Sequence, residues 1–156
     1  MKLYGFSRSS AAFRVRIALN VKGIAWEHIN VSLPDGDQFG SDYAKVNPQG
    51  RVPTLIDGDN TLIQSMAILE YLEETHPEPA FLPAGPAARA RVRGLADIIA
   101  CDIHPLNNLA ILKFLANEMG ADKDAVNVTW YQHWIYEGFN ALEALLATDS
   151  ATGTFS

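Results

Sequence analysis

Two serines stand where the first predicted strand of the chain gives way to its first predicted helix. Residues 2–6 alternate as a strand does, and residues 13–21 carry apolar side chains at helical spacing, so the helix begins near Ser9 or Ser10. A helix N-terminus exposes unpaired N–H groups and a partial positive charge, which stabilise an anion such as a thiolate. Each serine adds a hydroxyl donor. The stretch is suited to activating a thiol, although serine is also a favoured N-cap that needs no ligand.

Two later motifs can likewise be explained either by ligand binding or by local structure alone. Gln64-Ser65 precedes a helix predicted over residues 65–74, so the first N–H groups of that helix could bind a carboxylate, and a plain N-cap explains the serine equally well. Val52-Pro53 opens a predicted strand, and taken alone its peptide bond is expected to be trans, as most X-Pro bonds are. Only the combination of these motifs with the two serines is specific.

The elements that must position these motifs fall into two halves. The first half predicts a strand, a helix and a parallel strand in a βαβ unit, then a short weak helix and a hairpin before the last helix. The second half predicts helices only, with Pro105 kinking the first of them and residues 120–122 separating it from the second. The predicted bounds after the first helix are 26–31, 38–45, 52–56, 61–63, 65–74, 87–117 and 130–146. A proline-rich stretch, residues 77–86, is read as the interdomain linker.

The composition of the chain argues against some classes of binding partner. The chain has 156 residues, 48% of them hydrophobic, which suits one ordinary globular domain or two small ones. A formal charge of −6 argues against nucleic acid or an anionic membrane as partner. A local cluster of Arg8, Arg14 and Arg16 could still guide a small anion. The single cysteine, and first residues that lack a signal-peptide pattern, favour the cytoplasm.

Several side chains are expected in the core rather than in a site. Cys101 lies in an apolar helical run and is expected to be a small buried hydrophobe. The histidines outside the second half's first helix lack neighbours at metal-ligand spacing, so no metal is implied. The apolar positions expected to face the interior are Phe13, Ile17, Leu19 and Val21 on the first helix, and Trp134, Phe139, Leu142 and Leu145 on the last.

Together, Ser-Ser before Phe-Arg-Val-Arg-Ile-Ala-Leu, then Val-Pro-Thr-Leu, then Gln-Ser before a helix resemble a glutathione transferase, the zeta class fitting best. The resemblance continues through residues 101–109. It implies an α/β thioredoxin-like domain over residues 1–78, a linker over 79–86 and an all-α glutathione-transferase domain over 87–156. The family continues with further helices, so this second domain is expected to be incomplete.

The resemblance also implies a glutathione site and a role for each motif. Ser9 aligns with the catalytic serine of the family, and the adjacent Ser10 is the alternative donor to the sulfur. Arg8 is expected to bind a substrate carboxylate, because a guanidinium pairs well with one. Ala11 stands where the family has a cysteine, so that cysteine is unavailable here. The remaining contacts implied for glutathione are Gln38, Val52, a cis Pro53, Gln64, Ser65, His104 and Asn108, the last two facing the site from the helical domain.

The activity that the resemblance implies is the glutathione-dependent cis–trans isomerisation of a maleyl-type enedioate, in the catabolism of aromatic amino acids. Leu109-Ala110 stand where the maleylpyruvate relative has an arginine pair, which favours maleylacetoacetate. A homodimer is also implied. Two alternatives stay open: a general transferase that conjugates electrophiles to glutathione, and a non-catalytic interaction module, against which the retained Ser9 and Ser10 argue.

Overall fold

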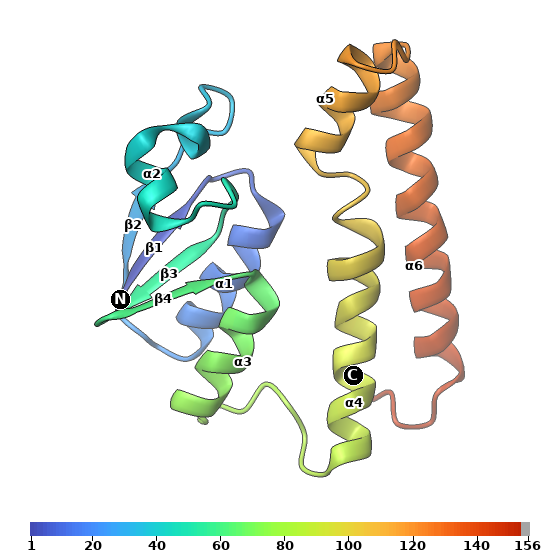
Figure 1. Cartoon of the computed structure of the whole chain (residues 1–156). Helices are drawn as coiled ribbons and strands as arrows, with labels where there is room; N and C mark the ends of the chain where they lie inside the picture. The colour runs from blue at the N-terminus through green and yellow to red at the C-terminus, as the bar shows by residue number, and fades with distance from the viewer. Residues whose placement is uncertain (154–156) are drawn as a thin grey trace. The chain divides into compact units, whose positions relative to one another are not determined.

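The computed structural model describes residues 1–153, which belong to two compact units, one of Met1–Phe81 and one that begins at Leu82 (Figure 1). The change from one unit to the next falls within the proline-rich stretch. Among the residues described, no helix combines the length and the apolar character that crossing a membrane requires.

A four-stranded mixed sheet forms the centre of the first unit, with strand order β2-β1-β3-β4. The strands are β1 (Lys2–Gly5), β2 (Glu27–Asn30), β3 (Thr54–Asp57) and β4 (Asn60–Ile63). β1 pairs in parallel with β2, and α1 (Ser10–Val21) connects them, so the predicted βαβ unit is confirmed. β3 pairs antiparallel with both β1 and β4, which confirms the hairpin.

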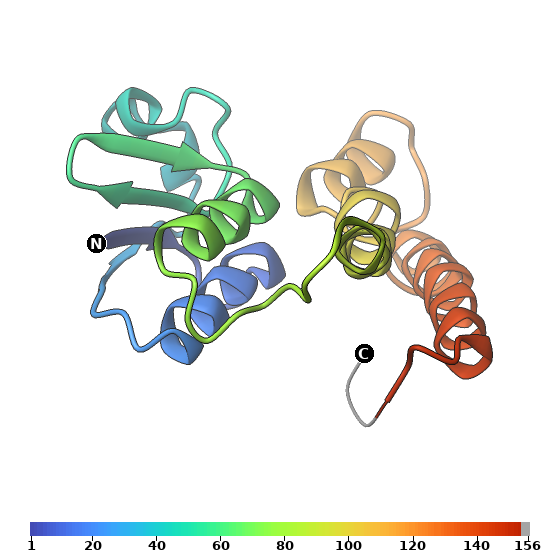
Figure 2. The same cartoon turned by 90° about the horizontal axis from the view of Figure 1, so that it is seen from below.

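Helices α1 and α3 (Ser65–Thr75) lie side by side on one face of this sheet (Figures 1 and 2). The core between them and the sheet consists of Leu3, Val15, Ala18, Leu19, Leu55, Ile68 and Leu72. The weak helix predicted over residues 38–45 is two elements instead, η1 (Asp37–Phe39) and α2 (Ser41–Val46). They are separate because Gly40 between them is extended, with φ −66° and ψ 149°, and so interrupts the helical hydrogen bonding.

The expected interior face of α1 is wrong for three of its four residues. Leu19 is buried, but Phe13, Ile17 and Val21 are 53%, 47% and 53% exposed. The reason is a close approach between helix and sheet: a Cβ at Gly5 would lie only 3.2 Å from the Cβ of Ala12. Because only a small side chain fits at this contact, Ala12 faces β1 here, and the buried side of α1 consists of Ala11, Ala12, Val15, Ala18 and Leu19.

The second unit consists of α4 (Pro86–Asp97), η2 (Ile98–Ile103), α5 (Leu109–Asn117), η3 (Ala125–Trp130) and α6 (Tyr131–Thr148). α6 runs back alongside the earlier helices and contacts η2 (Figure 1). The single kinked helix predicted over residues 87–117 is wrong, because the chain leaves the helix at His104 and resumes at Leu109. Pro105 cannot donate a helical hydrogen bond, and the side chain of Asn108 caps the new helix.

Three core expectations for this unit are also wrong. Phe139 and Leu145 are 42% and 49% exposed, whereas Trp134 and Leu142 are partly buried. Cys101 is exposed rather than buried. The inward position on η2 is taken by Ile103, which packs where α6 presents Gly138, so Cys101, two residues earlier, lies on a different side.

Candidate functional site

The first candidate, Ser9, is the N-cap of α1, as the sequence predicts. Its backbone is extended (φ −75°, ψ 116°), and its Oγ accepts a hydrogen bond from the Ala12 N–H at 3.2 Å. This bond uses a lone pair of the oxygen and not the hydroxyl proton. Capping and donation to a ligand are therefore compatible at Ser9. Ser10 is the first residue of the helix and is exposed.

The turn before Ser9 is held from within α1. Arg16 donates to the carbonyl oxygens of Phe6, at 3.3 Å, and Ser7, at 2.9 Å. Arg8 lies on the same turn and is exposed, and it has no hydrogen bond or ion pair to any other residue that the structure describes. A guanidinium so placed is available to a small anion.

The second helix start is the N-terminus of α3. Gln64 occupies the N-cap position with a positive φ of 69° and makes no side-chain capping bond, while Ser65 is the first helical residue and is 6% exposed. Arg14 on α1 donates from Nη1 to Ser65 Oγ at 2.8 Å. The plain N-cap explanation of Ser65 is therefore wrong. The hydroxyl accepts from a cation and retains its own proton for donation, which suits a carboxylate at this helix end.

The Val52-Pro53 peptide bond is cis, as the resemblance implies. The proline is buried and Val52 is partly buried, at the end of a loop, residues 47–52, that enters β3. Two side chains donate to the Arg51 carbonyl oxygen just before it: Tyr43 from its hydroxyl at 2.6 Å and Asn47 from Nδ2 at 2.8 Å. The backbone next to Val52 is thus fixed by hydrogen bonds from inside the unit.

Gln38 and Gln64 are the two glutamines that the resemblance assigns to glutathione binding. Gln38 lies on η1, is 8% exposed, and has a buried Oε1 without a hydrogen-bond partner among the described residues. A buried acceptor left unpaired is costly, so this oxygen suits a ligand N–H. Gln64 donates from Nε2 to Gln49 Oε1 at 2.9 Å, which ties the loop to the start of α3.

Comparison with known proteins agrees with this geometry. The family described as glutathione S-transferase, N-terminal domain, matches residues 1–74. A maleylpyruvate isomerase from Ralstonia sp. is 49% identical over 156 residues, which are 100% of this chain and 73% of that protein. A solved structure of a maleylpyruvate isomerase, described as a bacterial zeta-class glutathione S-transferase, is 50% identical with a TM-score of 0.94 and matches 98% of this chain and 72% of that one. The chain belongs to the zeta class of the glutathione transferases.

Another zeta-class neighbour has ligands. It is a maleylacetoacetate isomerase from Methylobacterium extorquens AM1, solved with bound malonate and glutathione. It is 46% identical, has a TM-score of 0.96, and matches 99% of this chain and 72% of that one.

Three other residues named from the zeta-class pattern have clear places in this glutathione transferase. Ala11, in the cysteine position, is 7% exposed in the first turn of α1. His104 and Asn108 belong to the second unit, on either side of the break after η2, and Asn108 accepts the Ala110 N–H at 2.9 Å as the N-cap of α5. Their approach to the residues of the first unit stays a prediction.

The sequence did not reveal which residues hold the glutathione transferase motifs in place. In the sequence Arg14 stands out only as part of a basic cluster, and nothing local shows that it reaches Ser65, 51 positions away. Tyr43 belongs to no motif of the sequence. The sequence signal for Asn47 is its place before a proline and a Gln-Gly pair, which is typical of turns.

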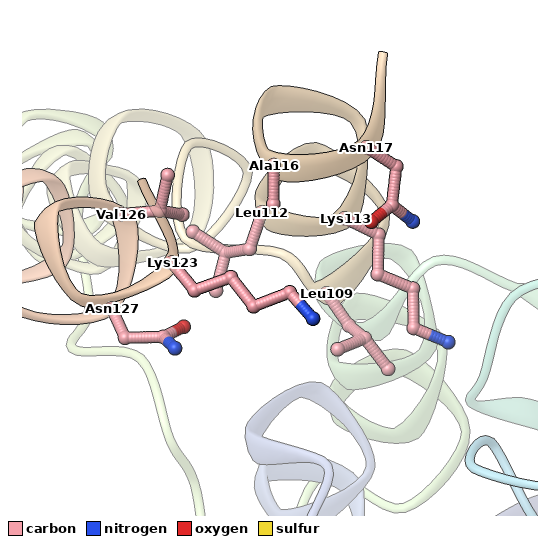
Figure 3. A pocket seen from close by; sticks show the side chains of 8 residues that line it. All are labelled: Leu109, Leu112, Lys113, Ala116, Asn117, Lys123, Val126 and Asn127. Carbon is pink, nitrogen blue, oxygen red and sulfur yellow. The ribbon is translucent and has the colours of Figure 1, made fainter. Parts of the chain in front are cut away.

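A cavity of about 310 Å³ opens between α5 and η3 of the second unit (Figure 3). Its apolar wall includes Leu112 and Val126, and the side chains of Lys113 and Lys123 extend along its rim. Leu109 also lines it.

Proposed function

We propose that this chain is a glutathione-dependent isomerase that converts a cis maleyl-type enedioate, such as maleylacetoacetate, into its trans isomer. The observation that carries the proposal is the Ser9 hydroxyl at the N-terminus of α1, whose oxygen caps the helix while its proton is available. The names of the zeta-class relatives support this activity. The relative solved with glutathione and malonate supports both the cofactor and a dicarboxylate as the other ligand.

The residues present fit glutathione. The unpartnered Gln38 Oε1 suits one of its N–H groups, and Ser65 with Arg14 and the free end of α3 suits its γ-glutamyl carboxylate. The Val52 backbone is proposed to pair with its cysteinyl backbone, as an added strand pairs with a sheet edge. Gln64 and Pro53 complete this surface in the first unit, and His104 and Asn108 are proposed to contribute from the second.

Cis–trans isomerisation by reversible addition to a conjugated double bond needs an activated nucleophile. Glutathione, when bound, supplies a thiolate that adds to one alkene carbon and leaves again after rotation about the resulting single bond, so no atom or electron is gained overall. Ser9 stabilises the thiolate by donating a hydrogen bond from its hydroxyl, together with the N–H groups at the start of α1. Ser10 is the alternative donor. Arg8 holds a carboxylate of the substrate and so orients the double bond.

The substrate preference rests on Leu109-Ala110. By the resemblance, the maleylpyruvate relative has an arginine pair where this chain has an apolar pair without a guanidinium, so we favour maleylacetoacetate over maleylpyruvate. Because the chain belongs to the zeta class, we also propose that it is a cytoplasmic homodimer that acts in the catabolism of aromatic amino acids. Sedimentation of the protein at micromolar concentration tests the dimer, and a monomer there would contradict it.

The decisive experiment is an isomerase assay with maleylacetone, in the presence and absence of glutathione. We expect turnover only with glutathione, and no consumption of glutathione during the reaction. A parallel assay measures conjugation of glutathione to chlorodinitrobenzene. Conjugation without isomerisation would replace the proposal with a general transferase, and inactivity in both assays would favour an interaction module.

A further inference from the structure

A buried group of polar side chains lies beneath the loop of residues 47–52. Tyr43 is 6% exposed, Asn47 is 1% exposed and Thr54 is fully buried. The Tyr43 hydroxyl is 2.9 Å from Thr54 Oγ1, and Asn47 Nδ2 donates to the same Thr54 oxygen at 3.2 Å. Burial raises the pKa of the Tyr43 phenol above its ordinary value, so the hydroxyl remains a donor throughout the neutral range.

Both Tyr43 and Asn47 direct their donors at one acceptor, the Arg51 carbonyl oxygen, at 2.6 and 2.8 Å. This carbonyl belongs to the peptide group that joins Arg51 to Val52. A trans peptide is planar, with its C=O and N–H pointing in opposite directions. Two bonds that hold the Arg51 oxygen toward the interior therefore hold the Val52 N–H away from it.

Asn47 fixes the rest of the loop as well. Its Oδ1 accepts the Gln49 N–H at 3.0 Å, and its backbone oxygen accepts the Gly50 N–H at 3.0 Å. Gly50 has φ +64°, and a Cβ there would lie 3.2 Å from the backbone oxygen of Gln38. Only glycine fits this close approach easily, so the turn set by Asn47 lies directly against η1.

We propose that Tyr43 and Asn47 are positioning residues for glutathione, which act by fixing the orientation of the Arg51–Val52 peptide. The inference rests on the proposed function, because it assigns a purpose to the direction of the Val52 N–H. Neither side chain touches the ligand in this scheme. A merely structural role would lower stability when either is changed and leave the affinity for glutathione as it was.

The test compares Tyr43→Phe with Tyr71→Phe. Each removes one tyrosine hydroxyl from the first unit, but the Tyr71 hydroxyl donates to Asp57 Oδ2 at 2.8 Å, away from the loop. Calorimetry with glutathione gives Kd, and the isomerase assay gives kcat and KM. For Tyr43→Phe we expect Kd and KM for glutathione to rise by about three- to tenfold, the usual worth of one lost hydrogen bond, with kcat at saturating glutathione within about twofold.

Two more variants test whether the rise in Kd for glutathione comes from the bonds to the Arg51 carbonyl. Asn47→Ala removes the other donor to the Arg51 carbonyl and should raise Kd in the same way. Thr54→Val removes a hydroxyl from the same buried group but leaves both bonds to that carbonyl, so Kd should stay within about twofold of wild type although stability falls. Phenylalanine retains the ring contact of Tyr43 with Tyr4, whose centroids are 5.8 Å apart, so Tyr43→Phe is the conservative change.

The outcomes separate the inference from the proposed function. If the wild-type protein binds no glutathione, the proposed function is overturned, and the positioning role with it. If the wild type binds glutathione but Tyr43→Phe and Asn47→Ala bind it equally well, only the positioning role is overturned. Equal losses of affinity in Tyr43→Phe and Tyr71→Phe would also overturn it, because they would reflect a general loss of order in the first unit.

Discussion

Arg14 donates from Nη1 to Ser65 Oγ at 2.8 Å, which joins the second turn of α1 to the first residue of α3. Eight positions further along each helix, Lys22 and Glu73 form an ion pair at 3.0 Å. These two contacts show that the helices run in parallel, so their N-termini lie at the same end of the first unit. Two sites suited to anions thereby share one end, with a guanidinium between the helices.

Replacing Arg14 with glutamine should weaken glutathione binding. The variant removes the cation beside the Ser65 hydroxyl and the proposed carboxylate position, so we expect Kd to rise by about threefold or more and to depend less on salt. Calorimetry at low and high ionic strength measures both. Lys45→Gln is the control, because it removes an exposed charge whose partner, Asp42, is also exposed. Equal salt dependence in wild type and Arg14→Gln would argue against a role for Arg14 at the carboxylate.

Replacing Ser9 with alanine should raise the pKa of bound glutathione. A hydroxyl that donates to the sulfur favours the thiolate, and each unit of pKa corresponds to about 1.4 kcal/mol. Turnover near neutral pH should fall and partly recover at higher pH. The measurement is the thiolate absorbance of bound glutathione against pH in wild type, Ser9→Ala and Ser10→Ala.

The Ser9 experiment needs a control for lost helix capping, which costs about 1 kcal/mol for alanine. Ser9→Gly lacks the hydroxyl but caps almost as well as serine. It should therefore match Ser9→Ala in the pKa of the thiol while retaining more stability. Identical titration curves in every variant would leave activation to the helix N-terminus alone.

The sequence predicted the starts of helices well, because capping depends on a few adjacent residues. Ser9, which caps α1, is such a local signal. It predicted the buried face of α1 poorly. Phe13 and Ile17 are more hydrophobic than alanine, but the contact with Gly5 of β1 admits only the small side chain of Ala12, and no local pattern states how closely two elements approach.

The candidate site could be predicted only in part, because a local pattern does not show which elements the fold brings together. Its motifs were found from their resemblance to a family, residue by residue. The bonds that hold them, such as Gln64 to Gln49 and Tyr43 to the Arg51 carbonyl, join residues of different elements. Such pairs are brought together by the fold, so they became visible only with the structure.

Lys22→Met should destabilise the first unit strongly. The lysine side chain is fully buried, and it donates to Glu73 and to the carbonyl oxygens of His76 and Pro79. Removing one partner of a buried pair leaves a buried charge uncompensated, which costs about 3–5 kcal/mol. Urea unfolding measures the loss.

Two further variants test that explanation. Adding Glu73→Leu to Lys22→Met should recover part of the stability, because the buried carboxylate is then gone. Lys45→Met, from the exposed pair with Asp42, should change the free energy of unfolding by less than about 1 kcal/mol. A loss in Lys22→Met no larger than in Lys45→Met would show that the buried pair contributes little.

Gly138→Ala should destabilise the second unit, against the general preference of helices for alanine. A Cβ at Gly138 would collide with Cγ1 and Cδ1 of Ile103, a side chain that is only 6% exposed and so has little room to move. Overpacking of this kind costs about 1–3 kcal/mol, which exceeds the 0.5–1 kcal/mol that alanine gains over glycine within a helix. Gly94→Ala in α4 is the matched control, since a Cβ there meets no other described residue within 4 Å, and it should stabilise the protein. Combining Gly138→Ala with Ile103→Val removes one of the two crowded carbons and should restore part of the lost stability.

Urea unfolding followed by tryptophan fluorescence measures these changes in the second unit, through Trp130 and Trp134. A Gly138→Ala protein as stable as Gly94→Ala would show that α6 and η2 do not pack this closely.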